Sequence, residues 1–345
     1  MSGQVTDGPS PFRPELPVWR RIDLGRCSPL RAQTFVESVA PFVGAGEVPN
    51  TLLFARPDSP YVSLGFHQSF AEEVDPQFVA RRRIPVIRRV EGGGTTWLDS
   101  DQWFYQLVYR DEGAGGPGDL ARFLRPVAEA ATEQGLTLTV RPPSDLVVGE
   151  RKISGNAGGD WDGAHILVGG ILGRADRESM ANLLRLPHPG VRPIVRAELA
   201  RWVTSWVDET GHLPEWTAFA DAVTKAFGEA GLFRTRSADP SEAEEAHFRR
   251  ETVVRHQETT WRELPPLPRT ASSVERRLRV AGPHGILVLA GPGSGERRIA
   301  IVNGAEVGAG YTLGPSLEAV ARPLPRESSE FEELAAAVRS ITGFD

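Results

Sequence analysis

A single cysteine, Cys27, occurs in the 345 residues, which excludes an intrachain disulfide and a four-ligand Cys/His metal cluster. The chain also lacks a run of eighteen apolar residues, and its first twenty residues contain no apolar stretch typical of a secretory signal. Basic charge is not in excess either, because the formal net charge is −6. We therefore expect a cytoplasmic location, no membrane partner and no general binding of nucleic acid. A local basic cluster can still hold one phosphate group.

The remaining composition is that of an ordinary globular protein, with 40% hydrophobic and 24% charged residues. A chain of this length fits one large domain with a smaller one appended. Residues 1–17 are rich in Gly, Pro and Ser and predict a flexible tail, while the charged and Pro-rich stretch 236–265 predicts a linker. This division leaves a main domain at 18–235 and a small α+β C-terminal domain at 266–345.

Hydrophobic periodicity predicts a mixture of helices and strands in both domains. In the main domain, alternating or continuous apolar residues predict strands at 51–55, 61–65, 84–90, 102–109, 136–140, 145–148, 152–154 and 166–172. Helical spacing predicts helices at 28–42, 120–131 and 216–227. In the C-terminal domain we expect strands at 274–280, 285–290 and 297–302 and a helix at 329–341. The fold class predicted is α+β.

The first segment with a chemical signature reads Arg88-Arg89-Val90-Glu91-Gly92-Gly93-Gly94-Thr95. Three glycines directly after a strand remove every Cβ from a sharp turn, so a ligand can approach the backbone closely. Successive unshielded N–H groups can also point at one anion, and two arginines add positive charge. A solvated turn with surface arginines is the plainer interpretation. The flanking arginines and the apolar strand favour an anion or nucleotide site.

The second segment reads Ser144-Asp145-Leu146-Val147-Val148-Gly149-Glu150-Arg151-Lys152-Ile153-Ser154-Gly155-Asn156-Ala157. Its lysine follows a tight hairpin and stands beside backbone donors. Lys152 could there neutralise charge that develops between a carboxylate and an α-phosphate. Asp145 could bind Mg²⁺ or orient the lysine. For this segment alone, a solvated surface lysine is the competing interpretation.

Together, and in this order, the two segments resemble the lipoate–protein ligase branch of the biotin/lipoate protein ligase superfamily. The stretches RRVEGGGTTWLD, SDLVVGERKISGNA and LVGGIL stand where that branch has its three motifs, and the resemblance covers roughly residues 50–230. It implies a mixed-sheet catalytic domain that cradles an acyl-adenylate, with ATP and Mg²⁺ as cofactors. Segment 266–345 is similar in position and strand content to the small accessory domain of bacterial ligases.

The resemblance also implies roles for single residues. Lys152 is similar to the family's catalytic lysine, which contacts the acyl carboxylate and the α-phosphate, and Asp145 corresponds to an aspartate that could organise Mg²⁺ and phosphate. Residues expected to bind the acid or the adenylate, besides Asp145, are Arg88, Arg89, Glu91, Gly92, Gly93, Gly94, Thr95, Ser154, Gly155, Asn156, Ala157 and Gly169.

The sequence departs from the family motifs mainly where the motifs have polar side chains. The replacements are Leu98 for His, Glu91 for Ser, Ser144 for Asn, Leu167 and Val168 for a His pair, and Gly170 for Thr. Each lost hydrogen bond is worth about 1–3 kcal/mol if it was buried. An unshielded Glu91 would repel a carboxylate, or it could hold a substrate amine. The identity of the acid is therefore less defined than the fold.

The leading functional hypothesis is ATP-dependent activation of lipoate or a similar carboxylic acid, followed by transfer to an amine such as a lysine of a lipoyl or acyl carrier domain. A second adenylating activity would ligate a different small acid to a different acceptor. An octanoyl or lipoyl transferase would need a cysteine nucleophile or another arrangement of the lysine. A ligase-like binding protein that has lost its chemistry is the non-enzymatic alternative.

Overall fold

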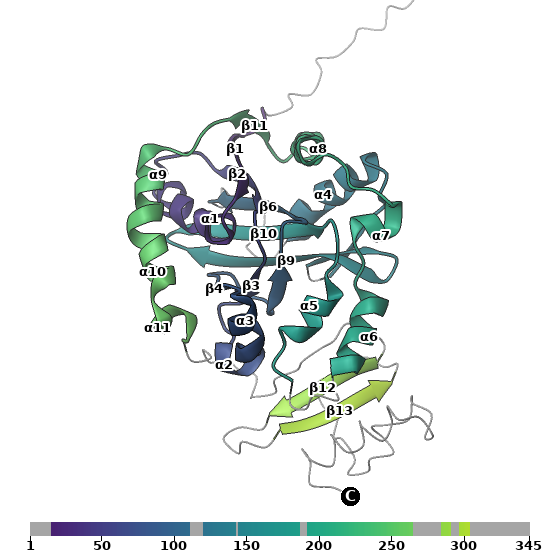
Figure 1. Ribbon diagram of the computed structural model, residues 1–345. Helices are drawn as coiled ribbons and strands as arrows, with labels where there is room; N and C mark the ends of the chain where they lie inside the picture. Colours follow the sequence, from purple (N-terminus) through teal and green to yellow (C-terminus); the bar gives the residue numbers. More distant parts are fainter. Residues whose placement is uncertain are drawn as a thin grey trace, which may run out of the picture.

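The computed structural model describes residues 15–110, 120–142, 144–186, 192–264, 284–290 and 297–303. Its centre is an eight-stranded sheet in the order β11-β1-β2-β6-β10-β9-β8-β7 (Figure 1). Its strands are β1 (Val18–Cys27), β2 (Thr51–Pro57), β6 (Gln102–Tyr109), β7 (Thr139–Arg141), β8 (Asp145–Val148), β9 (Arg151–Trp161), β10 (Ala164–Leu172) and β11 (Arg234–Ser237). Strand β1 pairs in parallel with β2 and β11, and the pairings from β2 to β7 are antiparallel. The predicted mixed-sheet α+β fold is confirmed.

A second, three-stranded sheet has the order β4-β3-β5. Its strands are β3 (Tyr61–Leu64), β4 (Val86–Arg88) and β5 (Thr96–Leu98), and the short helices α2 (Phe70–Glu73) and α3 (Pro76–Arg82) connect β3 to β4. The triple glycine lies between β4 and β5. Two further strands, β12 (His284–Ala290) and β13 (Arg297–Asn303), pair with each other in antiparallel fashion.

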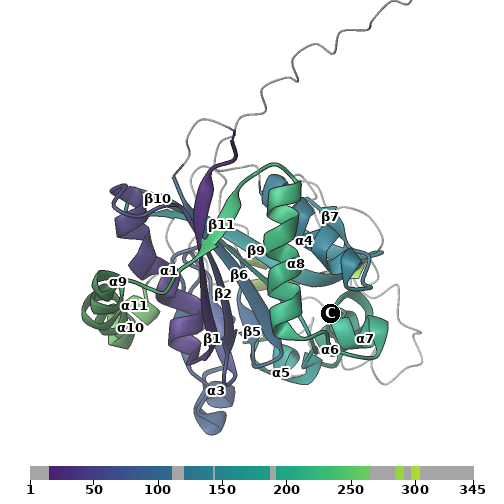
Figure 2. The ribbon, with the colours of Figure 1, turned by 90° about the horizontal axis from the view of Figure 1, so that it is seen from above.

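Helices cover the two faces of the main sheet from opposite sides (Figure 2). Helices α4 (Ala121–Glu133) and α8 (Trp216–Glu229) lie on one face, and α1 (Pro29–Gly44) lies on the other. Helices α5 (Arg177–Asn182), α6 (Arg192–Trp202) and α7 (Trp206–Thr210) follow β10 along the chain. Among the described residues, four helical segments follow β11: α9 (Glu242–His247), η2 (Phe248–Thr252), α10 (Val253–Gln257) and α11 (Thr259–Arg262). Among the described helices, none is long and apolar enough to cross a membrane.

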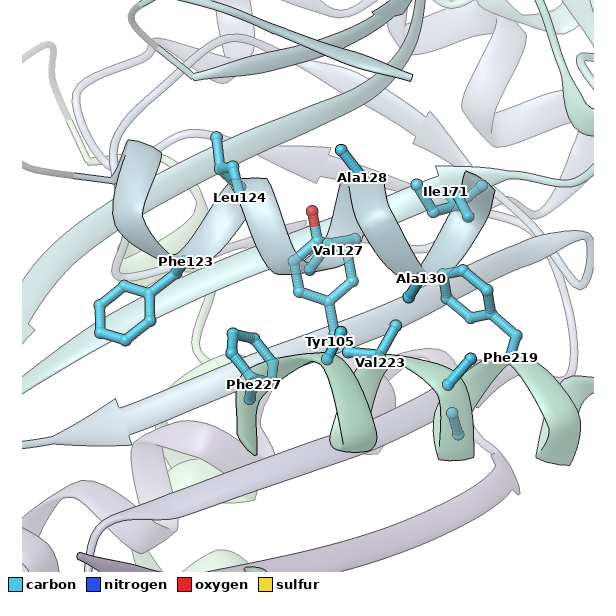
Figure 3. Packing of buried hydrophobic residues seen from close by; sticks show 14 of the residues in the cluster. Tyr105, Phe123, Leu124, Val127, Ala128, Ala130, Ile171, Phe219, Val223 and Phe227 are labelled. Atoms are coloured by element: carbon cyan, nitrogen blue, oxygen red, sulfur yellow. The ribbon is translucent and has the colours of Figure 1, made fainter. Parts of the chain in front are cut away.

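Strand β6 shows how the sequence divides the interior into two layers. Its alternate residues Trp103, Tyr105, Leu107 and Tyr109 face α4 and α8, as the period of two predicts, and all belong to the largest hydrophobic cluster. Figure 3 shows Tyr105 between the packed side chains of these two helices. Burying each such large side chain stabilises the fold by about 1.5–3 kcal/mol. The intervening residues face α1, where the second cluster lies.

Residues 242–262, which lie inside the stretch whose composition predicts a linker, form four helical segments on the α1 side of the sheet (Figure 1). Ser241 and Glu244 form a reciprocal capping box that starts α9. Glu244 is fully buried and accepts a 2.6 Å hydrogen bond from Arg20 of β1. Glu244 therefore belongs to an intrachain interface, while charged neighbours such as Glu242 and Arg249 stay exposed to solvent.

Two strands of the main sheet, β1 and β11, were also not predicted. Arginines interrupt the apolar pattern of β1, and β11 is a polar edge strand that follows from its pairing with β1. In the C-terminal part, the strands predicted at 285–290 and 297–302 are present. The strand predicted at 274–280, the helix predicted at 329–341 and most of the predicted tail at 1–17 lie outside the described residues.

Candidate active site

Lys152 lies near the start of β9, and a β-bulge decides which face of the sheet it joins. Asp145 pairs with Gly155 and Leu146 with Ser154, but Val147 pairs with Lys152, so the register skips Ile153. One extra residue shifts the alternation of side chains by one. Lys152 therefore shares a face with Asp145 and Gly155. The contacts agree, since a Cβ on Gly155 would lie 3.1 Å from the Lys152 Nζ.

The carboxylate of Asp145 holds the ammonium of Lys152. The Lys152 Nζ lies 2.7 Å from Asp145 Oδ1, and the Arg141 Nη2 donates to Asp145 Oδ2 at 2.9 Å. The Lys152 and Asp145 side chains are 34% and 22% exposed, so this pair adds only about 0–1 kcal/mol to stability. Its main effect is to orient the ammonium. Two cations around one carboxylate give the trio of Arg141, Asp145 and Lys152 a net positive charge.

The triple-glycine loop lies on the same face of β9 as Lys152, farther along the strand. The N–H of Gly92 donates to the Gly158 carbonyl at 3.3 Å. A Cβ built on Gly93 would lie 3.7 Å from the Ala157 Cβ, and a Cβ built on Gly159 would lie 3.3 Å from the Glu91 Cα. Because glycine and alanine line this part of β9, loop and strand approach each other closely. The structure thus brings the two predicted segments together on one surface.

Arg89 shapes the loop from inside. Its buried guanidinium donates to the carbonyls of Ser63, Gly92 and Gly94 at 3.2, 2.6 and 2.9 Å. Burial lowers the pKa of Arg89 below its ordinary value. Gly93 has a φ of +90°, a backbone conformation that only glycine adopts readily. A Cβ on Gly94 would meet nothing within 4 Å, so this side of the loop is open to a ligand.

Glu91 is fully buried, and neither of its carboxyl oxygens has a hydrogen-bond partner. The pKa of Glu91 is raised to about 8, chiefly by burial and also by the nearby Glu37, while Arg89 opposes the change. The side chain is therefore mostly protonated at pH 7. The repulsion of a substrate carboxylate, expected from the sequence, does not arise from a neutral group.

Three residues expected to bind the adenylate face away from Lys152. Asn156 accepts a hydrogen bond from the Tyr105 hydroxyl and donates to Ser154 Oγ at 3.2 Å. A Cβ on Gly169 would lie 2.0 Å from Asn156 Oδ1, so only glycine fits there. Ser154, Asn156 and Gly169 support the site from the α4 and α8 side of the sheet. Their expected binding of the adenylate stays a prediction, and the bulge is the reason why they lie on the other face of the sheet from Lys152.

Thr95 and Arg88 also bond to the protein itself. The Thr95 hydroxyl donates to Gln68 Oε1 at 2.7 Å, and the same oxygen accepts the N–H of Gly65 at 3.2 Å. Arg88 is fully buried, and each of its three side-chain nitrogens donates to main-chain carbonyls. In this structure both residues fix the frame of the loop.

The metal-binding role expected for Asp145 stays a prediction. Both of its carboxylate oxygens are already paired with cations, and no cluster of three or more His, Cys, Asp or Glu side chains among the described residues could hold a metal. Mg²⁺ prefers carboxylate and phosphate oxygens with several waters. The contacts seen give Asp145 another task, which is to hold Lys152.

Sequence reasoning missed Arg141 and Tyr105. Arg141 stands four residues before Asp145 across the tight connection of β7 and β8, a spacing that hints at the ion pair. Tyr105 enters the sequence analysis only as part of the strand at 102–109, although Gly169 pairs with it and leaves room for its ring. A compositional signal was also available, because Lys152 is one of only two lysines among 39 basic residues.

Cys27 is the last residue of β1 rather than part of a helix. Burial raises the pKa of its thiol to about 11, so little thiolate forms at neutral pH. The order of the sheet places four strand spacings, about 19 Å, between β1 and β9. Cys27 is therefore poorly placed and poorly activated as a nucleophile beside Lys152.

Solved structures share this fold. A bipartite lipoate–protein ligase from Thermoplasma acidophilum aligns with a TM-score of 0.64 and 20% identity, covering 75% of this chain and all of that chain. A lipoate–protein ligase A bound with ATP aligns with a TM-score of 0.61 and 21% identity, covering 71% and 98% of the two chains.

Sequence relatives include both transferases and ligases. The octanoyltransferase LipM of Symbiobacterium thermophilum is 26% identical over 235 residues, which are 61% of this chain and 86% of that protein. The lipoate–protein ligase LplJ of Bacillus subtilis is 31% identical over 100 residues, 29% of this chain and 30% of that protein. The model of the lipoyl protein ligase A/B catalytic domain matches residues 28–228, more than half of the sequence. With the mixed sheet and the paired motifs, this match shows that the chain belongs to the lipoyl protein ligase A/B catalytic domain family.

Proposed function

We propose that this protein activates a lipoate-like carboxylic acid with ATP as an acyl-adenylate and transfers the acyl group to an amine, such as a lysine of a carrier domain. The observation that carries the proposal is the shared face of β9, where the Lys152 ammonium and the triple-glycine loop lie. The Lys152 ammonium attracts an anion by its charge, and the glycine loop has no side chains that would keep an anion away from its main chain.

In the first step a carboxylate oxygen of the acid attacks the α-phosphorus of ATP. A new P–O bond forms, the bond to the β-phosphate oxygen breaks, and pyrophosphate leaves. Negative charge gathers around the α-phosphate in the transition state, and the Lys152 ammonium stabilises it there. Asp145 keeps the ammonium in place, and Arg141 offsets the charge of that carboxylate.

In the second step the nitrogen of the acceptor amine attacks the acyl carbon. The amide bond forms, AMP leaves with the bonding electrons, and the amine loses a proton to solvent. Two solved structures with this fold support the reactants, since one is a lipoate–protein ligase A bound with ATP and the other belongs to a study of a bipartite lipoate–protein ligase and its E2 lipoyl domain. Mg²⁺ is expected as the counter-ion of ATP.

The test compares Lys152→Ala with Lys225→Ala, the same change at the only other lysine, which lies exposed on α8. Pyrophosphate release is measured with Mg-ATP and a panel of acids that includes lipoate and octanoate. Loss of a preorganised charge predicts a rate about 10²–10³-fold lower for Lys152→Ala and an unchanged rate for Lys225→Ala. If the unchanged protein releases no pyrophosphate with any acid, or Lys152→Ala retains full activity, the proposal fails.

Octanoyl transfer without ATP is the second candidate, because the LipM relative matches over most of its own length. Acyl transfer by covalent catalysis needs an activated nucleophile. Cys27 is the only cysteine in the sequence, and its raised pKa and distance from β9 weigh against it. Transfer of octanoate from an acyl-carrier thioester in the absence of ATP, lost in Cys27→Ser, would favour this candidate over the first.

A further inference from the structure

Arg88 joins two parts of the chain that are far apart in sequence. Its guanidinium bonds to the turn after β3 on one side and to the end of α11 on the other. The acceptors are the carbonyls of Gly65 at 3.3 Å, Phe66 at 2.7 Å, Gln68 at 2.6 Å, Trp261 at 2.9 Å, Arg262 at 2.9 Å and Leu264 at 3.1 Å. A planar guanidinium has N–H donors on opposite edges and can bridge two groups of carbonyls in this way, whereas the ammonium of a lysine is a single compact donor group.

The contact is reciprocal. The indole Nε1 of Trp261 donates to the Arg88 carbonyl at 3.0 Å. The Trp261 ring also packs near Phe66 and Trp161, with ring centroids 6.0 and 6.2 Å apart. Each of the two residues thus donates a side-chain hydrogen bond to the main-chain carbonyl of the other, and these bonds fix α11 against the end of β4. We call this pair of residues the Arg88–Trp261 latch.

A second attachment holds the same helical segment to α1. The buried carboxylate of Glu37 lies 2.5 Å from Arg255 Nη2 and 3.0 Å from His256 Nε2. The guanidinium of Arg255 also lies 4.8 Å from the centre of the Trp161 ring. Because α10 is anchored to α1 in this way, the Arg88–Trp261 latch joins β4, which leads into the triple-glycine loop, to a helical segment that is itself held in place.

We propose that Arg88 and Trp261 are positioning residues, through which the segment 259–264 sets the geometry of the triple-glycine loop. Arg88 is the last residue of β4, and the next residue, Arg89, bonds to the carbonyls of Gly92 and Gly94. A shift of β4 therefore moves the loop. Segment 259–264 lies beyond the end of the family match at residue 228. That this loop binds the adenylate rests on the proposed function, whereas the mechanical link does not.

Such a link is necessarily two-way. A ligand that favours the ordered loop also favours docking of α11, by the same factor, because coupling between two sites is reciprocal. Any event that displaces segment 259–264 therefore loosens the loop. Conversely, an occupied loop is expected to protect the amides of 259–264 from hydrogen exchange.

The test is Trp261→Phe, which removes the indole donor and keeps an aromatic ring. Its matched control is Trp216→Phe, because the Trp216 indole nitrogen is buried without a hydrogen-bond partner. Hydrogen–deuterium exchange of amides 91–95 is measured on the ligand-free full-length protein. Loss of one hydrogen bond predicts exchange about five-fold faster in Trp261→Phe, confined to the loop and 259–264. In the control, these amides exchange as in the unchanged protein.

Arg88→Lys separates the latch from direct phosphate binding. It keeps the positive charge and loses the fork, so the latch predicts faster loop exchange and a KM for ATP at least about five-fold higher with kcat nearly unchanged. Unaltered loop exchange in both Trp261→Phe and Arg88→Lys overturns the proposal, and so does an equal rise over the whole protein. The exchange result stands even if the protein forms no acyl-adenylate, so failure of the proposed function would be recognised separately.

Discussion

Replacing Glu91 by Gln is expected to stabilise the protein, and to do so only above acidic pH. The carboxyl is fully buried with both oxygens unpaired, and glutamine has nearly the same shape without an ionisable group. An ionised carboxylate in such a place is costly because protein replaces its hydration without supplying a partner. The amide removes that cost.

The magnitude follows from the pKa of Glu91, which burial raises from 4.5 to about 8. A raised pKa means that the folded state holds the proton more tightly than the unfolded state. The stability contributed by the protonated group is complete below about pH 4.5 and is lost as the pH rises through about 8. Each pH unit in this window lowers the stability by ~1.4 kcal/mol, so relative to low pH the protein loses about 3 kcal/mol at pH 7 and about 5 kcal/mol above pH 8.

The assay is urea unfolding of the unchanged protein and of Glu91→Gln at several values between pH 5 and pH 9. We expect the free energies of unfolding of the two proteins to be close at pH 5. Their difference should grow by about 4 kcal/mol between pH 5 and pH 8, in favour of the glutamine variant. Glu47→Gln, a change of an exposed glutamate, serves as the control and should leave the pH dependence unchanged.

Parallel curves for the unchanged protein and Glu91→Gln over this range would refute the reasoning. They would mean that Glu91 ionises in the folded state at its ordinary pKa, and therefore that water or a counter-charge reaches it. In that case Glu91 would carry a negative charge beside the triple-glycine loop at neutral pH, and the repulsion of acids considered from the sequence would return.

Other substitutions test separate parts of the site. Lys152→Arg should lower pyrophosphate release at least about ten-fold, since a planar guanidinium does not replace a compact ammonium. Asp145→Asn should lower the same rate by about ten-fold and leave the melting temperature within a few degrees, because the partly exposed pair orients the lysine but adds little stability. Gly169→Ala should cost about 1–3 kcal/mol in urea unfolding, because the new Cβ meets Asn156 Oδ1 at 2.0 Å. Cys27→Ser should change pyrophosphate release by less than about two-fold, and a larger loss would contradict the placement of Cys27 far from β9.

Local patterns carried much of the fold. The alternation of Trp103, Tyr105, Leu107 and Tyr109 predicted β6 with its bounds, and the Gly149-Glu150 turn predicted the hairpin of β8 and β9. These elements follow from side-chain period and turn chemistry, which are properties of a few neighbouring residues. Strand β11 pairs with β1 from more than 200 residues away, and arginines interrupt the apolar pattern of β1, so no local pattern predicts either strand.

The same distinction applies to the site. The glycines of the loop and the lysine after the hairpin were recognisable because their residue types and order are unusual together. The face on which Lys152 lies was not, because it depends on a register shift between β8 and β9. The composition of 236–265 was misleading for a related reason: its acidic residues meet arginines of β1 and α1, such as Arg20, and only the folded chain shows this.

The single-residue bulge at Ile153 also has a consequence for how β9 can vary in length. Deleting Ile153 would let Lys152 pair with Val147 in an unbroken two-residue alternation, so the ammonium would stay on the face of Asp145 and Gly155. Straightening the strand with Ile153 kept would instead direct the ammonium into the apolar layer beneath the sheet and turn the side chain of Ile153 out of that layer. A one-residue deletion between Lys152 and Gly155 is therefore expected to keep the lysine in place, whereas loss of the bulge at constant length is expected to remove it.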